Sequence, residues 1–361
     1  MKTRTPYNII FLLLLIPFMA LANTPVKAKH TRKKVIKKEF NVNSNATLSI
    51  DNSYGNVDVI TWNENRIVFE ITITTNGNDS EKVQNKLEDI TVEFNATPSF
   101  VSAKTLFSKT KSKWWDWTGS SNVNMKINYI VKIPITNSVN LSNDYGAINL
   151  DKLEGRAKIN CDYGKITTKE LMADNNEIEF DYTSNSYFEY IKSGTINADY
   201  SGFTVAKTKD LLIEADYTNS KVEIGENVTY NCDYGSMTID MVNNFKGEGD
   251  YLTVVIGDVY KSVHIDADYG SIKIKNMTAN ANNVRIDSDY VGIKIGYDPK
   301  YVFDFELDLE YADLRDQDGF EFSSKRIESS DKYYKGYYGR ANSGNTVKIN
   351  SDYGSVSFIK N

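Results

Sequence analysis

The amino-acid sequence predicts an all-β protein, a parallel β-solenoid with coils of about 17–21 residues. The tripeptide Asp-Tyr-Gly, or a near copy of it, recurs along the chain, and successive copies from Tyr145 to Tyr311 stand 17 to 21 residues apart. A short fixed period is typical of a solenoid, because each coil buries its apolar side only by stacking on its neighbours. The tyrosines of the motif are Tyr145, Tyr163, Tyr182, Tyr200, Tyr217, Tyr234, Tyr251, Tyr269, Tyr290, Tyr311 and Tyr353, and an outlying copy contains Tyr54.

Each repeat shows the alternation of a half-buried strand on both sides of its tyrosine. Apolar and polar residues alternate from Val263 to Tyr269, and the alternation resumes at Ile272. The residue two positions before the tyrosine is usually small, as at Ala267, which suits a narrow interior. The glycine after the tyrosine suits a bend with unusual backbone angles. We therefore interpret each repeat as a strand, a Tyr-Gly bend, a second strand and a polar return turn.

Stacked coils would align the tyrosines in one ladder and the preceding aspartates in another, on the opposite face. We interpret the tyrosine ladder as part of the core, with offset rings and hydroxyls at an edge. The aspartate ladder has two interpretations. It is a row of solvated carboxylates that accept turn N–H groups, or a row of weak divalent-cation sites, since calcium binds several carboxylate oxygens. The aspartates are Asp144, Asp162, Asp181, Asp199, Asp216, Asp233, Asp250, Asp268, Asp289 and Asp352.

The two cysteines, Cys161 and Cys232, occupy the same repeat position four coils apart. Coils about 4.8 Å apart would separate them by about 19 Å, whereas a disulfide needs Cα atoms within about 7 Å. The register therefore predicts two free, buried thiols.

Residues 1–22 have the pattern of a secretory signal peptide, with two basic residues, an apolar run and the small-residue cleavage site Ala20-Leu21-Ala22. The residue directly after that site is Asn23 and not a cysteine, and no later apolar run is long enough to span a membrane. We expect an exported protein of the periplasm, the cell surface or the medium. The formal net charge of −6 and this address argue against a nucleic-acid partner.

Residues 23–38 form a basic leader, with seven lysine or arginine residues between Lys27 and Lys38. We expect this leader to be disordered and to run into a first strand at 35–42. The alternative is that it binds an anionic surface, such as a membrane leaflet or an acidic glycan.

The strand patterns in residues 39–135 predict a strand-rich cap over the open N-terminal end of the solenoid. Strands are expected at 35–42, 46–50, 57–61, 67–75, 90–95 and 123–133, and a helix at 80–87. A loop insertion at about 97–121 contains Trp114, Trp115 and Trp117. These tryptophans either bind a sugar, a membrane interface or a protein partner, or they plug the end of the solenoid.

The repeat solenoid is expected to cover residues 136–361, with a tyrosine-rich excursion at about 315–343. The excursion is interpreted as a long hairpin before a final rung at 347–358. Its tyrosines, together with the three tryptophans, are the candidate ligand or partner surface. They are Tyr333, Tyr334, Tyr337 and Tyr338.

The stretch Ile-Asp-Asn-Ser-Tyr-Gly-Asn-Val-Asp-Val-Ile-Thr-Trp at 50–62, followed by Val68 in a new strand, resembles the bacterial putative-adhesin family. That family consists of exported β-solenoid domains that open with an Asn-x-x-Gly-x-Val-x-Val-x-x-Trp-like stretch. The later Asp-Tyr-Gly coils extend the likeness over about residues 40–358. The resemblance implies a right-handed parallel β-solenoid at the cell envelope or outside it, and it carries no catalytic residues.

We therefore expect a non-catalytic, adhesin-like binding or structural module of the bacterial cell envelope that binds a glycan or an envelope protein. The alternatives are a periplasmic scaffold or sensing partner for another envelope protein, or a β-helix enzyme acting on acidic polysaccharide. Catalytic, cofactor and metal residues are not expected, because the two histidines, His30 and His264, stand apart from any Ser-His-Asp or Cys-His pattern or zinc-ligand spacing. A paired-carboxylate site stays open, because any two neighbouring coils would supply such a pair.

Overall fold

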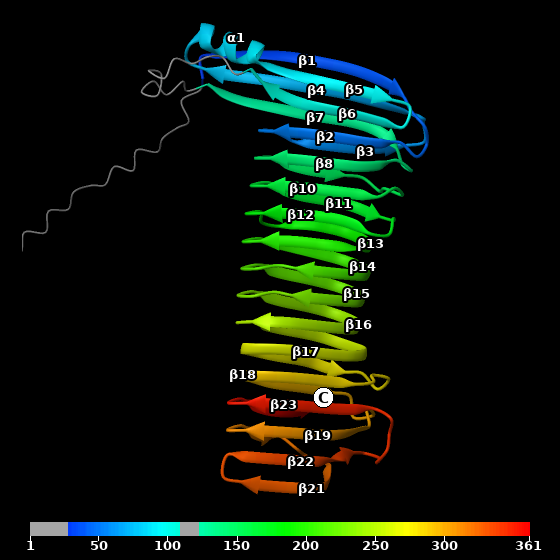
Figure 1. Cartoon of the computed structure of the whole chain (residues 1–361), viewed down its shortest axis with the longest axis vertical. Helices are drawn as coiled ribbons and strands as arrows, with labels where there is room; N and C mark the ends of the chain where they lie inside the picture. Colours follow the sequence, from blue (N-terminus) through cyan, green and yellow to red (C-terminus); the bar gives the residue numbers. More distant parts are fainter. Residues whose placement is uncertain (1–27, 109–122) are drawn as a thin grey trace, which may run out of the picture.

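The structure is a computed structural model that describes residues 28–108 and 123–361. These residues form an elongated stack of β-strands in one continuous open sheet, and the one helix among them lies near the N-terminal end (Figure 1). The predicted signal peptide and the predicted tryptophan surface lie outside the described residues. Within the described ranges, no helix has the length and apolar character needed to cross a membrane.

Each coil of the stack contributes two strand segments, one that leads into the motif aspartate and one that follows the motif. We call the two sides of the stack the leading face and the trailing face. The early coils have separate strands for them: β2 (Thr47–Ser53), β8 (Ser138–Asp144), β10 (Ala157–Asp162) and β12 (Asn176–Asp181) on the leading face, and β3 (Val57–Trp62), β9 (Ala147–Leu150) and β11 (Lys165–Leu171) on the trailing face.

In the middle of the stack, each strand carries the trailing segment of one coil into the leading segment of the next. Successive coils pair in parallel, so that Val205 lies opposite Val222 and Val222 opposite Ile239. Parallel pairing at this offset is the arrangement that the period predicts. These strands are β13 (Ser186–Asp199), β14 (Gly202–Glu214), β15 (Asn219–Asn231), β16 (Ser236–Asp250) and β17 (Thr253–Met277), which continues through the next motif. Strand β18 (Val284–Tyr297) carries the leading segment of its coil through the motif into the trailing segment.

The core lies between the two faces and is filled by every second side chain. Ile159 on the leading face and Ile166 on the trailing face are both buried, and the same alternation recurs in the other coils. Burying one such side chain stabilises the fold by about 1.5–3 kcal/mol. The small residue two positions before the tyrosine is also buried, as at Cys161 and Ala198. The small residue is therefore an interior residue, as its position in the repeat predicts.

Antiparallel strands close the N-terminal end. On the leading face β5 (Ile90–Thr97) pairs with β6 (Phe100–Phe107), which pairs with β2. On the trailing face β1 (His30–Asn41) pairs with β4 (Arg66–Gly77), which pairs with β7 (Asn124–Pro134) beside β3. Helix α1 (Ser80–Asp89) begins after Asp79, whose side chain accepts the N–H groups of Glu81 and Lys82. The helix expected at 80–87 is present.

Two expectations about this end are wrong. Strand β1 begins at His30, so most of the basic segment that we expected to be a disordered leader is a strand, paired with β4 along its whole length. The expected loop insertion contains strand β6, because Val101, Ala103 and Thr105 alternate inward and complete a hairpin with β5.

The C-terminal end contains the expected hairpin, but the order of the coils differs from the order of the sequence. Strands β21 (Phe320–Glu328) and β22 (Asp331–Tyr338) form the hairpin, which pairs through β22 with β19 (Phe303–Glu310). Strand β23 (Thr346–Asp352) lies between β18 and β19, and β24 (Ser355–Lys360) lies between β18 and β20 (Asp313–Arg315). The coil expected to be the final rung is therefore inserted inside the stack (Figure 1).

Candidate functional site

The motif tyrosines form an external ladder of stacked rings. Neighbouring rings along the ladder are nearly parallel, with centroids between 4.6 Å, for Tyr234 and Tyr251, and 5.3 Å, for Tyr54 and Tyr145. Each ring is exposed, from 41% at Tyr54 to 58% at Tyr311. The expectation that this ladder belongs to the core is therefore wrong. Because the ring faces cover one another, the ladder presents mainly ring edges and hydroxyls to solvent.

The backbone explains why the rings point outward. Every motif tyrosine has a positive φ, for example 55° at Tyr269. This left-handed conformation is uncommon for residues with a side chain, and it reverses the direction that strand alternation would give to the ring. The unusual angle that we expected at the glycine thus belongs to the tyrosine. The glycine has a different role, since a Cβ on Gly270 would lie 1.9 Å from the carbonyl oxygen of Leu252 in the adjacent coil.

The motif aspartates form a second row beside the tyrosines, on the outer surface and not on an opposite face. In six cases the Oδ1 atom of one aspartate accepts the backbone N–H of the aspartate in the next coil. The distance is 2.8 Å from Asp250 N to Asp233 Oδ1. The interpretation of these carboxylates as acceptors of backbone N–H groups is confirmed, with a donor from the neighbouring coil instead of a turn.

Repetition of the carboxylates affects their protonation. Burial, followed by the charges of Asp233 and Asp268, raises the pKa of Asp250 above its ordinary value, and burial with the charges of Asp268 and Asp352 raises the pKa of Asp289. In the part of the chain that the structure describes, no three Asp, Glu, His or Cys residues are grouped so that they could hold a metal ion.

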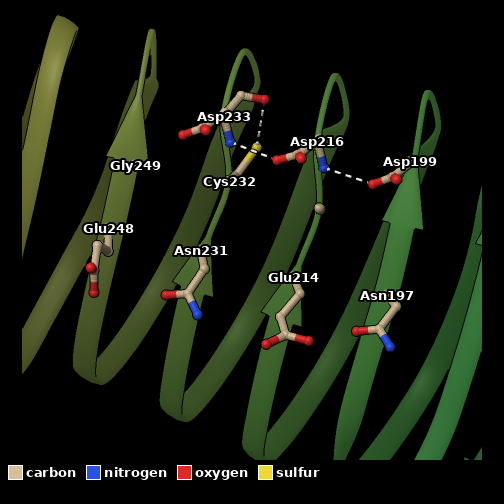
Figure 2. Close-up of a pocket in the computed structure, with 10 residues that line it drawn as sticks. Asn197, Asp199, Glu214, Asp216, Asn231, Cys232, Asp233, Glu248 and Gly249 are labelled. Atoms are coloured by element: carbon tan, nitrogen blue, oxygen red, sulfur yellow. Dashed lines mark hydrogen bonds between the residues drawn. The ribbon is translucent and has the colours of Figure 1, made fainter.

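A shallow acidic groove runs beside the aspartate row at mid-stack. Its volume is about 540 Å³. Figure 2 shows that a second row, Asn197, Glu214, Asn231 and Glu248, lies along the groove from coil to coil. Because the same chemistry is repeated along this face, the groove can contact an extended partner but does not define a local reaction centre.

A second hollow, which we call the C-terminal cavity, lies on the leading face over β19, β22 and β23. Its volume is about 610 Å³, within the usual range for small-molecule sites. The outward side chains around it combine an aromatic ring, two cations and amide and hydroxyl groups. The residues that line it include Asp304, Glu306, Lys335, Tyr337, Asn342, Thr346 and Lys348.

The two carboxylates of the C-terminal cavity already have partners. The carboxylate of Asp304 accepts the backbone N–H groups of Asn342 and Ser343, both at 2.9 Å. Glu306 forms an ion pair with Lys335 at 3.8 Å. Lys348 is exposed and forms no ion pair with the described residues. It is therefore the cation available to a ligand.

The four tyrosines predicted as a surface divide into two pairs. Tyr334 and Tyr338 are 6% and 7% exposed and belong to the core, where the ring of Tyr338 lies 5.0 Å from that of Tyr297. They are structural. Tyr333 and Tyr337 are half-buried on the other side of β22, and Tyr337 lines the C-terminal cavity.

Sequence reasoning missed the cationic residue that accompanies Tyr337. Lys348 lies on β23, which reaches the cavity only because β23 is inserted next to β19. Its alternation with Val347 and Ile349 marked it as an outward residue, but no sequence signal gave its neighbours.

Both cysteines are buried and free, as the register predicts. Burial raises the pKa of Cys161 to about 12 and that of Cys232 to about 11, so both thiols stay protonated at neutral pH.

No protein-family model matches the sequence, and no curated protein matches it. Among solved structures, the chain is similar to a putative cell adhesion protein from Clostridium sporogenes, with a TM-score of 0.19 and 11% identity over 91% of this chain and 100% of that chain. It is also similar to a putative lipid binding protein from Parabacteroides distasonis, with a TM-score of 0.30 and 10% identity over 90% and 97%.

A putative adhesin from Bacteroides fragilis gives a TM-score of 0.23 and 12% identity over 91% of this chain and 97% of that chain. At these TM-scores the likeness carries no argument about function. The family resemblance and the handedness that it implies stay predictions.

Proposed function

We propose that the chain is a non-catalytic, adhesin-like binding rod of the bacterial cell envelope, exported to the periplasm, the cell surface or the medium, and that it holds a glycan in the C-terminal cavity. The observation that supports this proposal most is the meeting of Tyr337 and Lys348 at one hollow of about 610 Å³. A long stack places this cavity near one end of the rod, where an extended ligand can reach it (Figure 1).

The chemistry of the cavity suits a saccharide that carries a carboxylate. Sugars combine an apolar ring face with hydroxyl groups, and an aromatic side chain beside amide and hydroxyl groups complements both. Tyr337 supplies the ring, and Asn342 and Thr346 supply polar groups. The ammonium group of Lys348 is the complement of a sugar carboxylate.

Calorimetry with tetragalacturonate and the neutral sugar cellotetraose tests the proposal. We expect binding of the acidic tetrasaccharide, weaker binding of the neutral one, and at least a tenfold loss in Lys348→Ala and Tyr337→Ala. Lys273→Ala, which removes an exposed lysine of the trailing face, is the control and should bind as the wild type does. Equal binding by Lys348→Ala and the wild type would contradict the site.

The proposal includes no cofactor. The aspartate row remains a candidate for weak divalent-cation binding, but six of its carboxylates already accept a backbone N–H. We therefore expect EDTA to leave the melting temperature unchanged. A fall of several degrees, restored by calcium, would show that cations stabilise the stack.

A scaffold for another envelope protein is the second candidate function. Strand β21 pairs with β22 on one side, and its other edge has no strand partner among the described residues. Ile327 on this strand is 54% exposed. An unpaired edge with an exposed apolar residue can accept a strand from a partner. Loss of capture of one envelope protein by Ile327→Lys, with tetragalacturonate binding retained, would favour this function.

A further inference from the structure

Strand β1 is a strongly basic edge strand at the N-terminal end of the rod. It pairs with β4 on one side, and no described strand pairs with its other edge. Five of its twelve residues carry a full positive charge and are exposed. They are Arg32, Lys33, Lys34, Lys37 and Lys38.

The positive charges lie on both sides of the unpaired edge. Ile36 and Phe40 pack against the core, so strand alternation places Arg32, Lys34 and Lys38 on their side of β1. Lys33 and Lys37 lie on the other side, next to Val35, which is 45% exposed. The charges from Arg32 to Lys38 therefore flank the edge along about 20 Å of strand.

Few of these charges are compensated. Lys37 forms an exposed ion pair with Glu70 at 3.0 Å, and Arg32 donates to the hydroxyl of Ser80. Lys33, Lys34 and Lys38 form no ion pair within the described part of the chain. Three lysines thus keep their full charge for a partner.

Protection of the edge against aggregation does not account for this charge. Lysines on edge strands discourage pairing with other chains, and a similar need exists at β5 and β21. Yet β5 contains no lysine or arginine, and Lys325 and Arg326 of β21 are matched by Glu321 and Glu328. Among these three edge strands, an excess of positive over negative side chains is found in β1 alone.

The leading face of the rod has the opposite charge pattern. The aspartate row and the glutamates of the acidic groove repeat along the leading face. An anionic surface would therefore attract the β1 end and repel the leading face.

We propose that β1 docks the rod onto the anionic headgroups of a phospholipid bilayer. A flat surface can approach this edge, because β1 lies at the N-terminal end of the stack, with α1 beside it (Figure 1). The exposed side chain of Val35 can enter the headgroup layer between the lysines. Docking in this orientation points the C-terminal cavity away from the membrane.

Vesicle sedimentation tests the docking surface. The chain from Asn23, the predicted mature N-terminus, is mixed with phosphatidylcholine vesicles or with vesicles containing 30 mol% phosphatidylglycerol, a composition on the order of that of anionic leaflets. We expect binding to the anionic vesicles only, weakening as salt is raised from about 0.1 M to about 0.5 M because the charges are screened.

The decisive comparison is between two triple variants of equal charge. Lys33→Gln/Lys34→Gln/Lys38→Gln should lose about 100-fold in apparent affinity for the anionic vesicles. Lys207→Gln/Lys273→Gln/Lys294→Gln removes three exposed, unpaired lysines of the trailing face and should bind like the wild type. Equal losses in both variants, or equal binding to both vesicle types, would overturn the proposal.

Sedimentation velocity without lipid separates this proposal from self-association. If β1 instead binds the acidic face of a second copy, the wild type will form oligomers at low salt that the β1 variant lacks, and the vesicle binding will be absent. Circular dichroism of both variants confirms that they are folded.

Discussion

Tyr290 and Tyr353 stack with ring centroids 4.7 Å apart, although Tyr311 lies between them in the sequence. Tyr311 stacks on the other face of Tyr353, at 4.8 Å. The same order holds in the backbone, where Ile286 lies opposite Ile349 and Ile349 lies opposite Leu307. The chain therefore leaves a gap of one coil after β18, builds the end of the rod, and returns to fill the gap.

Removal of residues 345–361 should consequently damage the interior of the stack and not merely shorten it. Strands β18 and β19 would face each other without the strand that pairs with both. We expect amides of β19 and β22 to lose protection in hydrogen exchange, while those of β14 keep theirs. Retained protection in β19 would mean that β18 and β19 can pair directly.

The tyrosine ladder should contribute to stability through both its rings and its backbone. Tyr217 stacks on Tyr200 and Tyr234 at 4.8 and 5.0 Å. We expect Tyr217→Asn to lower the free energy of unfolding by about 1–3 kcal/mol, because two stacks are lost while asparagine tolerates a positive φ. Tyr217→Val should cost about 1–3 kcal/mol more, since a β-branched residue is strained in that conformation.

Urea denaturation measures these changes, and the end of the ladder provides the control. Among the described residues, Tyr311 stacks on Tyr353 alone. Tyr311→Asn should therefore cost about half as much as Tyr217→Asn. Equal stability of Tyr217→Asn and Tyr217→Val would show that the positive φ carries no strain.

Gly270, which directly follows Tyr269, and Gly292, which stands two residues after Tyr290, should respond differently to alanine. A Cβ on Gly270 would overlap the carbonyl oxygen of Leu252, whereas a Cβ on Gly292 has nothing within 4 Å. We expect Gly270→Ala to lower the free energy of unfolding by about 3 kcal/mol or more, because the clash lies between backbones of adjacent coils. Gly292→Ala should change it by less than about 0.5 kcal/mol. Similar denaturation midpoints for the two variants would contradict the close approach of the coils.

Two aspartates of one coil should have opposite effects on stability. Burial and the neighbouring charges of Asp268 and Asp352 raise the pKa of Asp289. Burial alone would raise the pKa of Asp287 too, but hydrogen bonds from Arg285 and Asn350 outweigh it and lower that pKa. At pH 7 we expect Asp289→Asn to raise the melting temperature slightly and Asp287→Asn to lower it.

The pH dependence of the melting temperature tests the raised pKa of Asp289. A carboxyl group with a raised pKa stabilises the fold most in its protonated form, and this contribution is lost as the pH rises through the raised value. The advantage of Asp289→Asn over the wild type should therefore shrink as the pH falls from 7 towards the ordinary value of 3.8. Melting curves of both proteins at a series of pH values from 7 towards 4 measure the difference, and an advantage that grows on acidification would be inconsistent with the raised pKa.

The repeating pattern of apolar and polar residues predicted the coils, but it wrongly placed the tyrosine rings in the core. Tyr269 stands two residues after the buried Ala267, so simple alternation places its ring inside. The φ of 55° at Tyr269 breaks that alternation, and no pattern of apolar residues records a backbone angle. The period likewise predicted which residues of two neighbouring coils pair with each other. It did not predict the order of the coils, because Val284 and Val347 occupy the same repeat position and either could pair with the preceding coil.

For the basic segment and the C-terminal cavity too, the sequence predicted individual residues but not their neighbours in the fold. The charges of β1 were visible in the sequence, but its pairing with β4 joins residues that are 25 (Asn41 and Arg66) to 47 (His30 and Gly77) positions apart. The cavity needs Tyr337 and Lys348 on strands that approach each other only through β19. Local composition identified candidate residues, and long-range pairing decided which of them share a site.

The repeated coils between the two caps make the protein a molecular ruler. Each middle coil pairs only with the coils before and after it, so a whole repeat such as residues 218–234 can be removed or duplicated without altering the strands at either end. Every added coil would lengthen the rod by about 4.8 Å and extend the ladder by one tyrosine. The distance between the basic edge and the C-terminal cavity is thus encoded by the number of repeats, and it can vary in steps of one coil.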